Sequence, residues 1–231
     1  MVPVYVSVGL AWEPAEHAML DRLLQAPIFA GRLAPLVKVE FTMRDVYAPT
    51  HWAIRGTPPD YDTPDEDVYL TGRNLVLLTK AGVVALQKNA RRIALGLLAG
   101  NPFPDARPAF FRAMAQAISL GLDHTIEIAT PFLMWEKEEV IRRGVELGVP
   151  MNLTLSCMNP FIRPGGPGGS GRPGRTGEAG GAGSNVEDSQ SDSGEHLPAH
   201  CGLCSKCRER RDAFEAAGIE DPTTYAHASP R

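Results

Sequence analysis

The stretch Cys201-Gly-Leu-Cys204-Ser-Lys-Cys207 carries three cysteines, each separated from the next by two residues, and it decides how the end of this chain folds. Such spacing lets three sulfur atoms point toward one centre, and a zinc ion takes about four tetrahedral ligands. Cys157 is the remaining cysteine of the chain, so the sequence predicts a four-cysteine zinc site. Four thiolates leave no open coordination position, and the metal is therefore expected to be structural.

A redox CxxC pair and a disulfide framework are the alternative interpretations of the same cysteines. Disulfide frameworks are typical of small secreted domains, and the N-terminus shows no basic segment followed by an apolar one. No apolar run approaches the ~20 residues that cross a bilayer. The net charge of −4 argues against broad nucleic-acid binding, which usually needs a basic surface. We therefore expect a cytoplasmic protein with reduced thiols, no membrane segment and no nucleic-acid partner.

Hydrophobic periodicity predicts alternating strands and helices, which favours a parallel sheet. Strands are expected at 2–8, 35–41, 92–98 and 125–129, and helices at 14–24, 74–88, 107–122 and 136–147. The strand at 92–98 is uniformly apolar and is expected to be central. Residues 47–71 are rich in proline and acidic side chains and are expected to form a long loop, a kind that is often functional. The predicted fold class is α/β, a Rossmann-like doubly wound parallel sheet followed by the cysteine knuckle.

Composition and predicted elements divide the chain into three segments. Residues 1–162 are expected to form the α/β domain, and residues 199–231 the zinc knuckle with its helix. Between them, residues 163–198 are dominated by Gly, Ser and Pro, which cannot bury enough apolar surface to offset chain entropy. We expect this insert to be a disordered linker rather than a phosphate-binding loop, because no strand precedes it and no helix follows it.

The cysteines and five further motifs together resemble the 7-cyano-7-deazaguanine synthase (QueC-like) family of queuosine biosynthesis. The motifs are Gly72-Arg73-Asn74, Asn101-Pro-Phe-Pro-Asp105, Glu136-Lys-Glu-Glu-Val140 and Leu147-Gly-Val-Pro150, with Arg210 to Thr223 after the knuckle. The resemblance covers nearly the whole chain apart from the insert. It implies an adenine nucleotide alpha-hydrolase-like fold and a ligase that uses ATP and Mg²⁺ to convert 7-carboxy-7-deazaguanine and ammonia into 7-cyano-7-deazaguanine.

The resemblance also implies roles for single residues. Arg73, Asn74 and Asp105 would bind the substrate, and Lys137 would bind ATP phosphates, although helix caps and a surface lysine would look the same in sequence. Trp12 could stack on a base or fill the core, and no catalytic group is identified. The implied partners are small molecules, and a homodimer is one of the assemblies left open.

One family motif does not occur in this sequence. The family begins with a strand that ends in Ser-Gly-Gly-x-Asp-Ser, a loop whose backbone N–H groups hold the pyrophosphate of ATP, whereas Met1 opens directly into what resembles the second strand. A fragment or mis-started reading of a longer gene is one explanation and a shortened protein the other, so ATP binding by these residues stays open. Two rival functions are a non-catalytic zinc-binding module of the same family and a nucleic-acid-binding knuckle, which Arg208, Arg210 and Arg211 would support.

Overall fold

The computed structural model describes residues 1–162 and 197–230, and most of the predicted insert therefore lies outside the described residues. Leu197 is exposed, whereas Pro198, which we had assigned to the insert, is buried beside the knuckle. The regular elements are β1 (Val4–Ser7), α1 (Glu13–Leu24), β2 (Val37–Glu40), α2 (Trp52–Arg55), α3 (Arg73–Gln87), β3 (Arg92–Ala94), α4 (Pro108–Leu122), β4 (Glu127–Ala129), α5 (Lys137–Glu146) and α6 (Ser205–Ala217). Short 3₁₀ turns cover Pro27–Phe29, Asp65–Val68, Pro104–Ala106 and Met151–Leu153.

All four expected strands are present, and they form two separate parallel pairs. Strand β1 pairs with β2, placing Val4 opposite Val37, and β3 pairs with β4, placing Arg92 opposite Glu127. The expectation of a central strand at 92–98 is wrong for the described residues, because β3 has β4 as its one partner strand there. Its apolar run is consequently only half-covered, and Ala94 is exposed.

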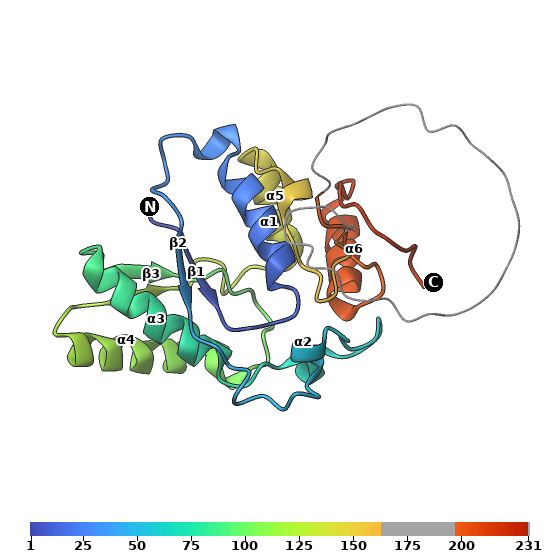
Figure 1. Cartoon of the computed structure of the whole chain (residues 1–231). Helices are drawn as coiled ribbons and strands as arrows, with labels where there is room; N and C mark the ends of the chain where they lie inside the picture. Colours follow the sequence, from blue (N-terminus) through green and yellow to red (C-terminus); the bar gives the residue numbers. More distant parts are fainter. Residues whose placement is uncertain (163–196, 231) are drawn as a thin grey trace, which may run out of the picture.

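Helices lie on two sides of the strands (Figure 1), with α3 and α4 together on one side and α1 and α5 on the other. Helices α3 and α4 approach closely at Gly82, where an added Cβ would lie 2.6 Å from Cγ2 of Ile118. Leu78, Phe111 and Ile126 complete the buried cluster between these helices and the second strand pair. Helix α6 packs on α5 in a smaller cluster of its own.

The 47–71 segment, expected to be a long loop, is folded against the core. It contains α2 and the Asp65–Val68 turn, and it buries Tyr47, Ala53 and Val68. Val68 belongs to the same buried cluster as the cysteines of the knuckle. The proline-rich composition of 47–71 predicts an irregular backbone. It does not predict that these residues are buried, because the burial depends on contacts with the knuckle, which is distant in sequence. Among the described residues, no helix combines the length and apolar character that a membrane span requires.

Candidate metal centre and adjoining cavities

The four cysteines predicted to be ligands lie together in the structure. Cys157 follows the Met151–Leu153 turn, Cys204 is the N-cap of α6, and Cys207 lies in the first turn of that helix. Their Sγ atoms are all within 4.8 Å of one another, and at most 6% of each residue is exposed. The cluster could therefore hold a metal ion.

The separations between sulfur atoms agree with one tetrahedral ion. The Sγ atoms of Cys157 and Cys204 are 4.0 Å apart, those of Cys201 and Cys207 are 3.8 Å apart, and those of Cys204 and Cys207 are 3.6 Å apart. Four sulfurs placed tetrahedrally at ~2.3 Å from a metal are separated by about 3.8 Å. A disulfide needs ~2.05 Å, and all four cysteines are free, so the alternative of a disulfide framework does not describe this cluster.

Backbone N–H groups surround the sulfurs. The N–H of Cys201 donates to Sγ of Cys157 at 3.2 Å, the N–H of Leu203 to Sγ of Cys201 at 3.3 Å, and the N–H of Gly202 to Sγ of Cys207 at 3.4 Å. Hydrogen bonds among the four thiols, chiefly those with Cys157, lower the pKa of Cys204 and lower the pKa of Cys201 to about 7. Hydrogen bonds within the same cluster raise the pKa of Cys157 and of Cys207, so the thiols share their protons. Backbone N–H donors around the sulfurs favour thiolates, the form in which cysteine binds metals.

Arg210 fixes the position of the knuckle, a role that the sequence analysis missed. Only 5% of the residue is exposed. Its guanidinium donates to Oγ1 of Thr223 at 2.6 Å, to Oγ1 of Thr154 at 2.9 Å and to the carbonyl of Met151 at 2.8 Å. This one side chain therefore connects α6 to the segment before Cys157 and to the C-terminal segment.

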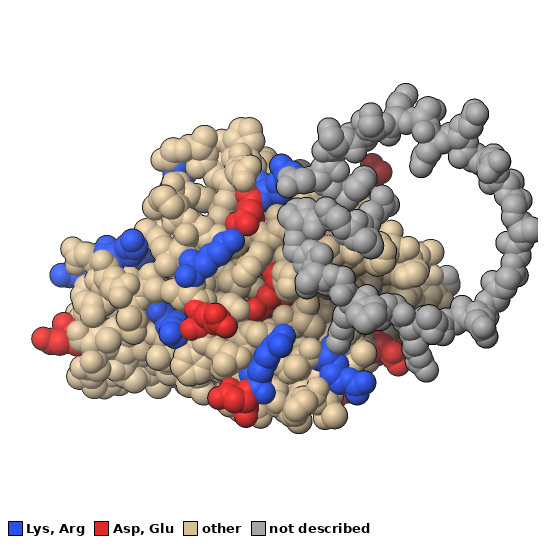
Figure 2. All heavy atoms as spheres, viewed as in Figure 1, with Lys and Arg blue, Asp and Glu red and all other residues tan. Residues whose placement is uncertain are grey.

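The arginines that would support a nucleic-acid-binding knuckle make contacts within the protein. Arg211 donates to the carbonyl of Gly202 at 2.8 Å and lies over the ring of Tyr225 at 3.9 Å, and Arg208 is 3.6 Å from Asp62. On the face shown in Figure 2, basic and acidic side chains are interspersed. Arg210 and Arg211 are thus engaged within the protein, and Arg208 alone does not make a basic surface.

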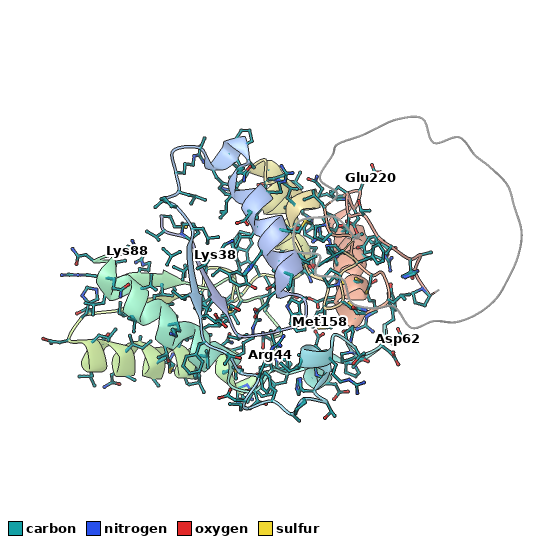
Figure 3. All side chains as sticks on the ribbon, in the orientation of Figure 1. Lys38, Arg44, Asp62, Lys88, Met158 and Glu220 are labelled. Carbon is teal, nitrogen blue, oxygen red and sulfur yellow. The ribbon has the colours of Figure 1, made fainter. Side chains whose placement is uncertain are left out.

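Two adjoining cavities lie beside the cysteine cluster. The first, which we call the aromatic cavity, has a volume of about 300 Å³. In it Trp12 stacks on Trp52 with 5.7 Å between ring centroids, and Tyr69 on Phe103 with 4.7 Å. Met158, labelled beside α6 in Figure 3, and Cys157 line its far wall. The aromatic rings around this cavity make it suited to a flat heterocycle. Trp12 belongs to the buried core, and that it also stacks on a base stays a prediction.

The second cavity, which we call the charged cavity, has a volume of about 760 Å³. It lies between the segment after β3, the N-termini of α3 and α5, and one face of α6. Six residues line both cavities and form their border: Arg73, Asn74, Leu97, Asn101, Phe103 and Lys206. The two cavities therefore share one wall.

Asp105 and Asn74 meet at this border. The backbone N–H of Asn74 donates to Oδ2 of Asp105 at 3.1 Å, and the Asn74 amide donates to the Asp105 carbonyl at 2.9 Å. Asn74 is therefore not the N-cap of α3, a position that Gly72 occupies with φ of 78°. Burial raises the pKa of Asp105, and the hydrogen bond from Asn74 partly opposes that shift.

Arg73 and Lys137 both line the charged cavity, but their side chains differ in their hydrogen-bond partners. Nε of Arg73 is buried and has no hydrogen-bond partner among the described residues, while the residue as a whole lines both cavities. Nζ of Lys137 instead forms an ion pair with Oε1 of Glu209 at 2.7 Å. Burial lowers the pKa of Lys137, and the charge of Glu209 opposes the shift. That Arg73 binds substrate and Lys137 binds phosphate stays a prediction.

Comparison with known proteins agrees with the sequence motifs. A family described as queuosine biosynthesis protein QueC matches residues 58–167. The 7-cyano-7-deazaguanine synthase of Methanopyrus kandleri is 30% identical over 220 residues, which cover 95% of this chain and 76% of that protein. The synthase of Caldicellulosiruptor bescii is 27% identical over 85% of this chain and 78% of its own length, and that of Brucella anthropi is 31% identical over 73% and 62%.

Parallel strand pairs flanked by helices, together with a buried four-cysteine knuckle, define an α/β protein whose C-terminal part could hold a metal ion. Similarity over nearly the whole chain then gives the particular family. The chain belongs to the QueC, or 7-cyano-7-deazaguanine synthase, family of queuosine biosynthesis.

Proposed function

We propose that this chain carries the substrate site of an ATP-dependent ligase that converts 7-carboxy-7-deazaguanine and ammonia into 7-cyano-7-deazaguanine. The observation that carries the proposal is the aromatic cavity bordered by Asp105 and Arg73, in a member of a family whose relatives bear that enzyme's name. We place the reaction in the cytoplasm, where thiols stay reduced.

The chemistry explains why two spaces are needed. A carboxylate does not react with ammonia directly, because its leaving group would be an oxide. Transfer of AMP from ATP to the carboxylate releases pyrophosphate, and attack by ammonia then displaces AMP, loses one proton and leaves an amide. A second adenylation of the amide oxygen, followed by loss of AMP and of the two amide protons, leaves the nitrile. The protein's contribution is to position the reactants and to stabilise charge.

Charges at the border suit this substrate. The ring of a deazaguanine presents adjacent N–H groups, and a buried carboxylate such as that of Asp105 can accept hydrogen bonds from them. The guanidinium of Arg73, a residue that lines both cavities, would donate to the substrate's carboxylate or to a phosphate. Lys137, with Mg²⁺, would balance phosphate charge in the charged cavity, provided that Lys137 shares its proton donors between Glu209 and the nucleotide.

We propose that the metal of the cysteine cluster is zinc, held by Cys157, Cys201, Cys204 and Cys207. Zinc with four thiolates supplies no reactive position and stabilises the fold instead. Its contribution here would be to fix the start of α6 and the segment around Met158, both of which contribute to the walls of the cavities.

We propose a continuous Rossmann-like sheet and an ATP site for a version of this chain that carries the family's first strand and loop. The 231 residues contain no Ser-Gly-Gly-x-Asp-Ser sequence, and no strand of the described residues joins β1 to β3. A triphosphate needs a set of preorganised N–H donors, which a strand-to-helix loop supplies. We therefore expect this chain to bind the deazapurine, and a version extended by a strand and that loop to turn it over.

The test compares both versions with Mg-ATP, ammonium and 7-carboxy-7-deazaguanine, measuring pyrophosphate and the nitrile by mass spectrometry. Loss of one oxyanion donor typically costs ~10²–10³ in rate, so the version without the loop should form no measurable nitrile. Lys38→Met serves as the control in the extended version, because Lys38 lies on β2 in an exposed ion pair with Asp21 (Figure 3). Deazapurine binding without turnover by the extended version would favour the non-catalytic zinc-binding module, and robust turnover by the 231 residues would show that the nucleotide site is misplaced.

A further inference from the structure

Lys206 stands between two of the four clustered cysteines, at the start of α6. Cys204 precedes it by two residues and Cys207 follows it, and both are almost fully buried. Its backbone is therefore held by the cluster itself, while its side chain extends to the cavities, with 24% of its surface exposed. Lys206 lines both the aromatic and the charged cavity.

The ammonium of Lys206 bridges two carboxylates from different parts of the chain. Its Nζ lies 2.8 Å from Oδ1 of Asp65 and 2.6 Å from Oε2 of Glu209. The other oxygen of Glu209 holds Lys137 at 2.7 Å. Two ammonium groups and two carboxylates thus alternate in one chain of contacts, and their formal charges cancel.

Asp65 begins the turn that leads into the wall of the aromatic cavity. Val68, Tyr69 and Leu70 follow it, and all three line that cavity. Tyr69 stacks on Phe103, so a displacement of this segment would change the space available to a flat ligand. The contact between Asp65 and Lys206 therefore joins a cavity wall to the metal-binding knuckle.

A second ion pair between the same two parts of the chain provides a comparison. Arg208 lies 3.6 Å from Asp62, whose side chain is 92% exposed, whereas Asp65 is 46% exposed. Water screens the pair with Asp62 almost completely, and such pairs contribute little. Of these two ion pairs, the pair between Lys206 and Asp65 is therefore the one that can hold residues 65–70 in place.

We propose that Lys206 is a positioning residue that ties residues 65–70 to the four-cysteine knuckle and so sets the aromatic cavity for a flat, carboxylated heterocycle. The identity of that ligand rests on the proposed function, whereas the tie itself does not. Removing the charge of Lys206 should loosen residues 65–70 while leaving the metal and α6 in place. Glu209, which is shared with Lys137, completes the arrangement on the side of the charged cavity.

The test uses the 231-residue chain with its metal and three variants: Lys206→Met, which keeps the aliphatic stem, Lys206→Arg, which keeps the charge, and Asp62→Asn as the matched control. Hydrogen exchange of backbone amides, followed by mass spectrometry, reports on residues 65–70, and metal analysis reports on the cluster. We expect Lys206→Met to speed exchange in 65–70 about 2- to 5-fold with unchanged metal content. Lys206→Arg should restore most of the protection, and Asp62→Asn should behave like the unaltered protein.

Unchanged exchange in Lys206→Met, or an equal increase in α1 and α4, would overturn the proposal. If Lys206→Met loses metal, Asp65→Ala removes the same ion pair from a residue that is remote from the cysteines in sequence, and it must then give the local increase for the proposal to stand. Calorimetric titration with 7-carboxy-7-deazaguanine is the separate readout for the ligand. Weaker binding by Lys206→Met, restored in Lys206→Arg, supports the positioning role. Absence of binding by the unaltered protein counts against the proposed function, while the exchange result still decides whether the tie exists.

Discussion

Asn74 and Asp105 are 31 residues apart in sequence and share two hydrogen bonds, at 3.1 Å to the Asp105 carboxylate and at 2.9 Å to its carbonyl. The first bond satisfies an N–H at the start of α3, where four such groups have no partner within the helix. A carboxylate in that place also benefits from the positive end of the helix dipole. The same carboxylate borders the aromatic cavity, so capping and proposed substrate binding fall on one residue.

Replacing Asp105 by Asn is expected to stabilise the protein at neutral pH while weakening deazapurine binding at least tenfold. Burial raises the pKa of the Asp105 carboxyl in the folded protein, so ionisation of this group opposes folding. The neutral carboxyl contributes stability at low pH, and this contribution is lost as the pH rises through the folded pKa. Asn cannot ionise, yet its oxygen can still accept the N–H of Asn74. The gain in free energy of unfolding should be largest above that pKa and should vanish toward the unfolded value of ~3.9. Chemical denaturation between pH 4 and 8 measures it, and an advantage that grows on acidification would contradict the assignment.

Replacing Cys157 by Ser is expected to reduce zinc from about one ion per chain and to lower stability. A buried cluster of three thiolates lacks the fourth ligand of a structural site, and loss of such a metal removes folding free energy directly. Metal analysis and thermal unfolding measure the two effects. Full zinc content with unchanged stability would show that the ligand set is wrong.

Replacing Arg210 by Met is expected to cost about 3 kcal/mol of stability. The variant leaves the oxygen atoms of Thr154, Thr223 and Met151 without their charged donor in a buried place. Arg143→Met provides the control, because Arg143 forms an exposed ion pair with Glu146 on α5. Equal unfolding midpoints for the two variants in denaturant would refute a special role for Arg210.

Replacing residues 163–196 by a short Gly-Ser linker is expected to preserve the fold and the zinc. The chain enters and leaves this segment at neighbouring points, because the N–H of Phe161 donates to the carbonyl of Ala199 at 2.8 Å and the N–H of Ala199 donates back at 3.0 Å. A linker of a few residues can close that gap, and loop closure costs only about 0.6 kcal/mol per doubling of length. Leu197 and Pro198 are kept because Pro198 is buried. Loss of zinc or a much lower melting temperature would show that the deleted residues carry structure.

Local sequence determined most of the elements and the whole set of clustered cysteines. Hydrophobic periodicity placed α1, α3, α4 and α5 to within a few residues, because amphipathic spacing is a local property. Few residue types bind soft metals, and with four cysteines in the chain the set of candidate ligands was complete from composition alone. The family motifs added the candidate site residues Arg73, Asn74, Asp105 and Lys137.

Only the tertiary structure decided which distant groups meet. The carboxylate of Asp105 accepts a hydrogen bond from the backbone N–H of Asn74 at the start of α3. Nothing in the sequence around either residue specifies that partner. Arg210 looked like a surface cation suited to nucleic acid, yet packing buries it among oxygen atoms from segments 56 and 13 residues away. The sequence carries no sign of the partner of Lys206, whose contact with Asp65 spans 141 residues. Charged side chains carry no periodic signal of their partners, because a hydrogen bond or ion pair depends on where the folded backbone brings two groups together.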